Sequence, residues 1–61
     1  MSTWRNIQDA APPIGQNVRA KDSVAGPEYI ARFNGHGAWM IIQFPHDYQP
    51  KERPTYWLDN R

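Results

Sequence analysis

The 61-residue chain contains no cysteine, which excludes disulfides and thiolate metal sites as the source of stability for so small a domain. No apolar run approaches the roughly 20 residues that a membrane-spanning helix needs, and the first residues lack the basic and then apolar order of a signal peptide. Seven Lys and Arg stand against six Asp and Glu, so no strong field attracts phosphates. We therefore expect a protein that is neither secreted through a signal peptide nor transmembrane, with nucleic acid as a secondary class of partner.

The aromatic side chains are what the sequence offers in place of disulfides. A domain of this length buries only about 60% of the surface of its unfolded chain, which leaves little room for an enclosed active site. Three Trp, three Tyr and two Phe are present, and each buried ring removes roughly 150 to 250 Å² from water. The rings are therefore predicted to form the core.

Turn-forming residues divide the chain into short segments with β character. Alternation and β propensity predict strands over residues 17–21, 28–33, 38–44 and 55–58. Residues 1–15 are predicted to be an ordered N-terminal arm, in which one helical turn and a short strand fit equally well. The prediction is a single, mainly β domain over residues 1–61, with an antiparallel meander of four to five strands over residues 16–61. The sheet either stays open or curls into a small open barrel.

The clearest hairpin is centred on residues 34–37, Asn-Gly-His-Gly, which tolerate positive φ. Two registers remain open. A bulge at Gly37 would place Trp39 on the same face as Tyr29, Ala31 and Phe33, whereas a plain turn at Asn34 and Gly35 would pair Ala31 with Ala38.

Residues that could carry chemistry are few. His36, His46 and Asp47 are the candidate metal ligands, but they lie in turn segments without a regularly spaced ligand pair, so solvated loop side chains are the favoured interpretation. No glycine-flanked serine suggests a nucleophile, and the glycines do not form a phosphate loop. The sequence predicts no enzyme, no cofactor and no small-molecule substrate.

The segment Ala38–Phe44 is the informative anomaly, because a strand with one wet face should alternate and this one is apolar on both faces. Trp39 and Ile41 are assigned to the core. The other face, with its polar rim, is the predicted protein-binding site and comprises Met40, Ile42, Phe44, Tyr48 and Arg32. An equally weighted alternative is that the N-terminal arm covers this face through Trp4 or Ile14.

The order of several short motifs resembles a family of small phage and prophage proteins, domain of unknown function 551. The matching positions are Trp4, Ile7, Pro12, Gly15, Ala31, Gly35, Trp39, Pro54, Thr55 and Trp57. The chain departs from the family by an additional residue between Ile7 and Pro12 and by Tyr56 in place of a histidine. The resemblance spans nearly the whole chain and implies a phage origin and a compact β fold. It carries no catalytic residues to transfer.

These observations lead to one functional expectation and two rivals. We expect a non-enzymatic, phage-encoded accessory protein that binds another protein through its β surface, as a small structural component of a virion. Its partner would be a capsid or tail protein, or a second copy of itself, in the host cytoplasm or the virion. The rivals are a small inhibitor of a host factor and a nucleic-acid-binding small β-barrel in which Arg32, Trp39 and Tyr48 face the strand.

Overall fold

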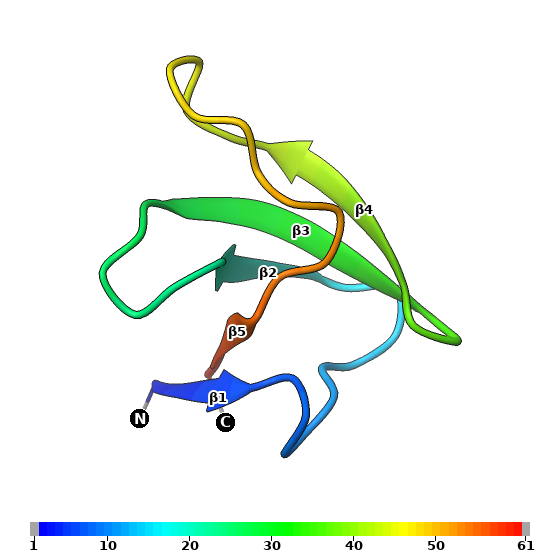
Figure 1. Ribbon diagram of the computed structural model, residues 1–61. Helices are drawn as coiled ribbons and strands as arrows, with labels where there is room; N and C mark the ends of the chain where they lie inside the picture. The colour runs from blue at the N-terminus through cyan, green and yellow to red at the C-terminus, as the bar shows by residue number, and fades with distance from the viewer. Residues whose placement is uncertain (1, 61) are drawn as a thin grey trace.

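The computed structural model describes residues 2–60 as one five-stranded antiparallel sheet. The strands are β1 (Thr3–Asn6), β2 (Asn17–Lys21), β3 (Glu28–Gly35), β4 (Ala38–Gln43) and β5 (Tyr56–Asp59). Their order across the sheet is β1-β5-β2-β3-β4 (Figure 1). This architecture confirms the prediction of a small, mainly β antiparallel fold.

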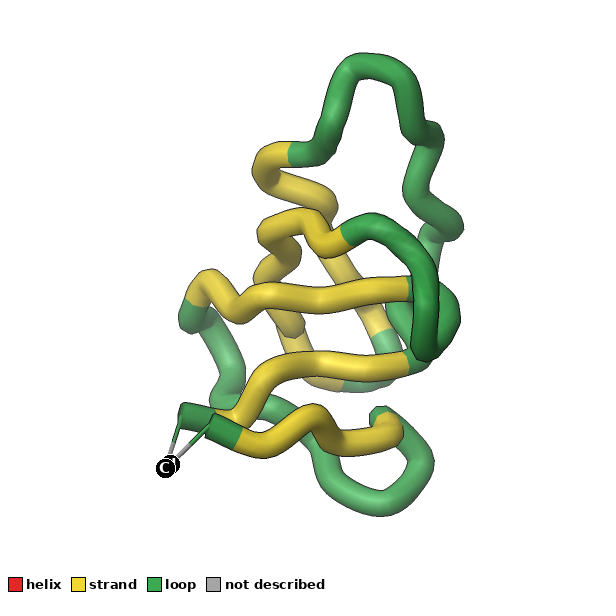
Figure 2. Tube along the Cα trace, turned by 90° about the vertical axis from the view of Figure 1, so that its left-hand side faces the viewer, coloured by secondary structure: helices red, strands yellow, loops and turns green. Residues whose placement is uncertain are grey.

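Strands β2, β3 and β4 form the meander, and β5 returns to lie between β1 and β2. The long connection between β4 and β5, residues 44–55, extends beyond the sheet before it turns back (Figure 1). The strands curl rather than lie flat, as the view from the side shows (Figure 2). Strands β1 and β4 remain at opposite edges of the sheet, each with a single neighbour.

The N-terminal segment forms a short strand and not the helical turn that the sequence also allowed. Residues of β1 pair with β5 over four positions, from Thr3 opposite Asp59 to Asn6 opposite Tyr56. The Ile7 N–H continues this connection by donating to the Thr55 carbonyl at 2.9 Å. The edge of β5 thus supplies partners for the backbone of this segment, which an isolated helical turn would lack. The first strand of the sheet therefore lies inside the predicted arm of residues 1–15.

The turn of the β3–β4 hairpin is formed by other residues than in either predicted register. His36 (φ 53°) and Gly37 (φ 76°) occupy the two central turn positions, where positive φ matches the twist of the strands. The bulge lies on β3, between Phe33 and Gly35, and not at Gly37. It nevertheless brings Phe33 opposite Trp39 and Ala31 opposite Ile41, the side-chain grouping expected from a bulged hairpin.

The core lies on the inner, concave side of the sheet. Ala20, Tyr29 and Ala31 are buried, and Trp39, Ile41 and Tyr48 pack against them. Trp57 is only 1% exposed, and its Nε1–H donates to the Ala10 carbonyl at 2.8 Å. Small residues at positions 20 and 31 leave room for the rings of Tyr29, Trp39 and Tyr48. The predicted aromatic core therefore holds in part, because Phe44 is exposed.

Candidate functional site: an apolar strip along an edge strand

Three large apolar side chains are exposed along β4 and just beyond its end. Met40 is 50% exposed, Ile42 40% and Phe44 44%. We call these three residues the apolar strip. They lie on the outermost strand of the sheet, which pairs only with β3, so the strip runs beside an unpaired backbone edge. Exposed apolar groups next to such an edge are typical of surfaces that bind other polypeptides.

A bulge in β4 changes how the strip is arranged. The sequence prediction assumed strict alternation, which would put all three side chains on one face. In the structure Ile41 lies opposite Ala31 while Gln43 lies opposite Ile30, so Ile42 is an additional residue without a partner on β3. Gln43 therefore joins the outer face with Met40, and the alternation that would have placed Ile42 and Phe44 on that face is broken at Ile42. The strip is a feature of the edge rather than of a single face.

Arg32 lies beside the apolar strip, at the polar rim where the sequence predicted it. It is opposite Met40 in the ladder, on the outer face, and it is half-buried. Its Nε–H donates to the Asn17 side-chain oxygen at 3.0 Å, which holds the guanidinium across the outer face of β2 and β3. Arg32 is thus next to the strip and already oriented by a neighbouring strand.

Tyr48 does not lie beside the strip. It is half-buried against the core cluster, with its ring centroid 6.5 Å from that of Tyr29, and its hydroxyl donates to Asp22. The sequence placed it at the rim because it follows the strand closely, but residues 44–50 fold back over the inner side of the sheet. Trp39 is also on the inner side, because it alternates with Met40. Arg32, Trp39 and Tyr48 therefore do not share one surface.

Neither residue expected to cover the strip does so. Trp4 lies on β1, at the opposite edge of the sheet, with the Lys21 ammonium 4.1 Å from its ring centroid. Ile14 is 69% exposed and approaches Gly35 at the far end of the hairpin. The strip therefore stays open to solvent.

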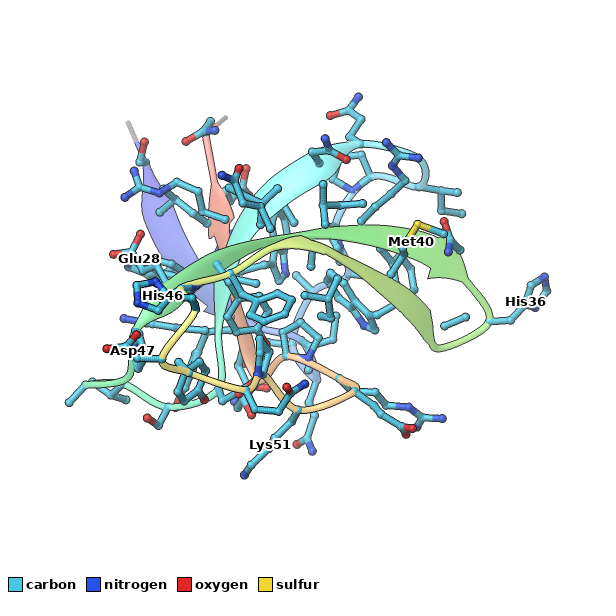
Figure 3. All side chains as sticks on the ribbon, turned by 90° about the horizontal axis from the view of Figure 1, so that it is seen from above. Glu28, His36, Met40, His46, Asp47 and Lys51 are labelled. Atoms are coloured by element: carbon cyan, nitrogen blue, oxygen red, sulfur yellow. The ribbon has the colours of Figure 1, made fainter. Side chains whose placement is uncertain are left out.

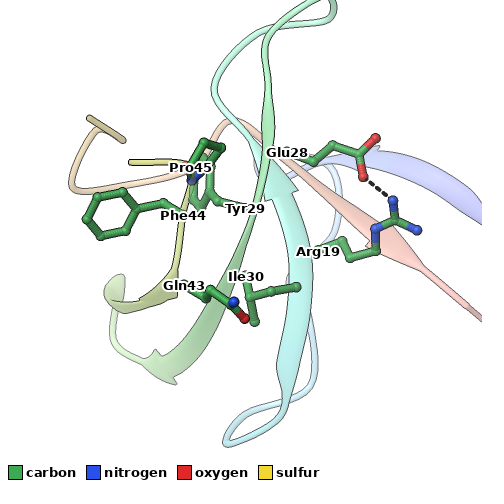
Figure 4. Close-up of a pocket in the computed structure, with 7 residues that line it drawn as sticks. All are labelled: Arg19, Glu28, Tyr29, Ile30, Gln43, Phe44 and Pro45. Atoms are coloured by element: carbon green, nitrogen blue, oxygen red, sulfur yellow. Dashed lines mark ion pairs between the residues drawn. The ribbon is translucent and has the colours of Figure 1, made fainter. Parts of the chain in front are cut away.

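A shallow groove of about 350 Å³ adjoins the strip at Phe44 (Figure 4). Its lining residues are Arg19, Glu28, Tyr29, Ile30, Gln43, Phe44 and Pro45. Arg19 Nη2 and a Glu28 carboxylate oxygen form an ion pair at 2.6 Å, which closes one end of the groove with neutralised charges. The remaining wall consists of Tyr29, Ile30, Phe44 and Pro45 with the polar Gln43 among them, so the groove continues from the apolar strip across the start of β3.

A buried carboxylate holds the segment that follows the strip. Asp22 accepts hydrogen bonds from the hydroxyls of Tyr29 and Tyr48, both at 2.5 Å, and from the Lys51 N–H at 3.0 Å. Burial raises the pKa of the Asp22 carboxyl, but the three hydrogen bonds and the Lys51 charge outweigh it, so the pKa lies below its usual value. No sequence signal linked Asp22 to Tyr48, because the two belong to different loops.

The candidate metal ligands do not come together. His36 lies at the tip of the β3–β4 hairpin, far from His46 and Asp47 beyond the other end of β4 (Figure 3). Within residues 2–60, no three side chains of the His, Cys, Asp or Glu type gather closely enough to hold a metal ion. In the same range, no helix is long and apolar enough to cross a membrane.

Comparisons with known proteins add no assignment. No protein-family model matches the chain, and neither the curated proteins nor the solved structures contain a match.

Proposed function

We propose that this chain is a non-enzymatic binding protein that docks on another protein through the apolar strip, with Arg32 at its rim. The observation that carries the proposal is the exposure of Met40, Ile42 and Phe44, between 40% and 50% each, beside the unpaired edge of β4. Within residues 2–60 no second layer covers these side chains, so a partner is the natural cover.

The energetics suit an anchor of this kind. Burying a whole Met, Ile or Phe side chain contributes roughly 1.5 to 3 kcal/mol, and each side chain of the strip is already about half covered, so docking gains roughly 1 kcal/mol from each. Arg32, fixed by Asn17, supplies a donor at the rim.

The resemblance to small phage proteins directs this proposal towards a structural component of a virion, with a capsid or tail protein as the partner. Inhibition of a host factor uses the same strip but predicts a soluble one-to-one complex instead of incorporation into particles. Binding of a nucleic-acid strand has less support, because the aromatic residues that it would need lie on the opposite side of the sheet from Arg32.

The experiment compares two aspartate substitutions at exposed aliphatic positions. Ile42→Asp puts a charge into the strip, whereas Val24→Asp puts the same charge on a residue of the loop between β2 and β3 that is 72% exposed. Tagged versions of both variants and of the unmodified chain are expressed in the native host, and their cross-linked partners are identified by mass spectrometry in particles and in the soluble fraction.

We expect Val24→Asp to keep the partner of the unmodified chain and Ile42→Asp to lose it, while both variants retain the parent melting temperature within a few degrees. Recovery of the partner in particles supports the virion role, and recovery only in a soluble complex supports inhibition. If Ile42→Asp keeps its partner, or if it unfolds the isolated protein, the strip is not a docking surface.

A further inference from the structure

The two edges of the sheet differ in charge, and this difference identifies what β4 can pair with. Edge strands are usually protected from pairing with other chains by charged residues, proline or a very short length. The β1 edge carries Arg5 in the middle of its four residues. Strand β4 has the sequence Ala-Trp-Met-Ile-Ile-Gln, without a charge or a proline, and its neighbours Gly37, Phe44 and Pro45 are also uncharged.

The backbone of β4 is available for pairing on its outer side. Its ladder to β3 is its only sheet contact, and no other backbone hydrogen bond in residues 2–60 involves Ala38–Gln43. Alternate residues of an edge strand direct their N–H and C=O groups away from the sheet. Those groups on β4 can therefore accept a further strand without breaking an existing bond.

From this combination we infer that β4 pairs antiparallel with β4 of a second copy of the chain, across a two-fold axis. In such a dimer every residue near the axis meets a residue of the same short segment, so a charge in that segment would face itself. The absence of charge from residues 37–45 removes that repulsion. A different protein partner gains no comparable advantage, because its specificity and orientation usually come from complementary charges.

The register follows from the side-chain faces. Opposed residues in a ladder point to the same face, so inward and outward residues of β4 cannot be paired with each other. The bulge at Ile42 limits the regular edge to Ala38–Ile41. Centring the axis on Met40 places Met40 opposite its own copy on the outer face and Trp39 opposite Ile41 on the inner face. Within that regular edge the ladder covers Trp39–Ile41, one residue shorter than the four-residue β1–β5 ladder of the same sheet.

The dimer goes beyond the proposed docking function and does not depend on it. Pairing through the backbone edge would bring the two apolar strips side by side, so a third protein could dock on a patch that spans the axis. Self-association is measured with the purified chain alone, whereas docking is measured as recovery of a different protein. Either result can therefore fail while the other stands.

The experiment measures the mass of the full chain in solution and then alters Met40. Sedimentation from micromolar to millimolar concentration should show a reversible transition from the monomer to twice its mass. Met40→Lys and Met40→Glu should each weaken the dimer by about tenfold or more, because like charges meet at the axis. An equimolar mixture of the two variants should recover the dimer. Val24→Lys and Val24→Glu are the matched controls and should behave as the unmodified chain.

Amide hydrogen exchange supplies a second measurement that needs no variant. The amides within Trp39–Ile41 that point away from β3 should exchange more slowly as the protein concentration rises, while amides of β1 should not change. A chain that stays monomeric at millimolar concentration overturns the inference. So does a dimer that is unaffected by both Met40 substitutions, or one whose concentration-dependent protection lies outside β4, since either result places the contact elsewhere.

Discussion

The Tyr48 hydroxyl donates a hydrogen bond to the Asp22 carboxylate at 2.5 Å, which joins the loop after β2 to the long connection after β4. The same carboxylate accepts from the buried Tyr29 hydroxyl and from the Lys51 N–H. Residues 44–55 have no strand or helix of their own, and these contacts hold the middle of the segment, while the Thr55 N–H donates to the Lys21 carbonyl at its end. A single acidic residue thus connects the core of the sheet to the surroundings of its exposed edge.

Replacing Asp22 should destabilise the protein strongly. Asp22→Ala removes the acceptor for all three donors and leaves the buried Tyr29 hydroxyl without its partner. Hydrogen bonds to a charged group are worth roughly 1.5 to 3 kcal/mol each, but their losses are not additive, so we expect the free energy of unfolding to fall by about 2 to 4 kcal/mol. Urea denaturation followed by tryptophan fluorescence measures the change.

Asp47→Ala is the matched control for this prediction, since Asp47 is an exposed loop residue. Its free energy of unfolding should stay within about 0.5 kcal/mol of the parent value. A loss below about 1 kcal/mol for Asp22→Ala would mean that water replaces the carboxylate without penalty, and the proposed tether would then be wrong.

Acid should weaken the protein through the same carboxyl. The pKa of Asp22 is lower in the folded state than its ordinary value of 3.8, because its hydrogen bonds favour the charged form against the effect of burial. A lowered folded pKa means that the stabilisation is fully present above the unfolded pKa and is lost as pH falls through the folded one. Melting temperatures of the parent and Asp22→Asn should therefore converge below about pH 4 and differ most near neutrality. If the melting temperatures of the parent and Asp22→Asn differ by the same amount at all pH values, the Asp22 carboxyl is not the source of the acid sensitivity.

The hairpin and its neighbouring strand could be predicted because their signals are local. Alternation marks residues 17–21, and the glycines at 35 and 37 mark the turn between two β-prone segments. The position of β5 between β1 and β2 could not be predicted in this way, because a ladder between distant segments leaves no trace in either one. Local patterns predict a meander with residues 1–15 as an arm outside it, whereas Thr3–Asn6 belong to the sheet.

For the candidate site too, the local signals could be predicted and the long-range contacts could not. The lack of alternation over Ala38–Phe44 pointed to Met40, Ile42 and Phe44, and all three are exposed. No glycine in the sequence marks the bulge at Ile42, so the change that it makes to the alternation of side chains could not be predicted. Tyr48 was placed at the rim by proximity in sequence, although its hydroxyl is bound to Asp22. Whether the strip binds a partner remains a prediction.

Trp57 should be the most sensitive aromatic position. Its ring is 1% exposed, and its Nε1–H donates to the Ala10 carbonyl, which ties the proline-rich loop to β5. Trp57→Phe removes this donor and part of the ring volume, so we expect a loss of about 1 to 3 kcal/mol. Trp4→Phe, at a half-buried position on the outer face, should cost clearly less. Thermal unfolding monitored by circular dichroism compares the two, and equal losses would contradict the assignment of Trp57 to the core.

Substitutions at Gly35 and Gly37 should separate two contributions to the free energy of unfolding, backbone strain in the hairpin turn and side-chain packing against it. Both have positive φ, +83° and +76°, where a β-carbon costs roughly 1 to 2 kcal/mol. A β-carbon at Gly37 would meet nothing within 4 Å, whereas one at Gly35 would lie 3.4 Å from Ile14 Cδ1. Gly37→Ala should therefore show the backbone cost alone. Gly35→Ala should show a similar cost, changed only slightly by Ile14, because that side chain is exposed and can move.

Urea denaturation of both variants, each repeated with Ile14→Ala, measures the coupling between Gly35 and Ile14. A coupling above about 1 kcal/mol would mean that Ile14 is held firmly against the hairpin.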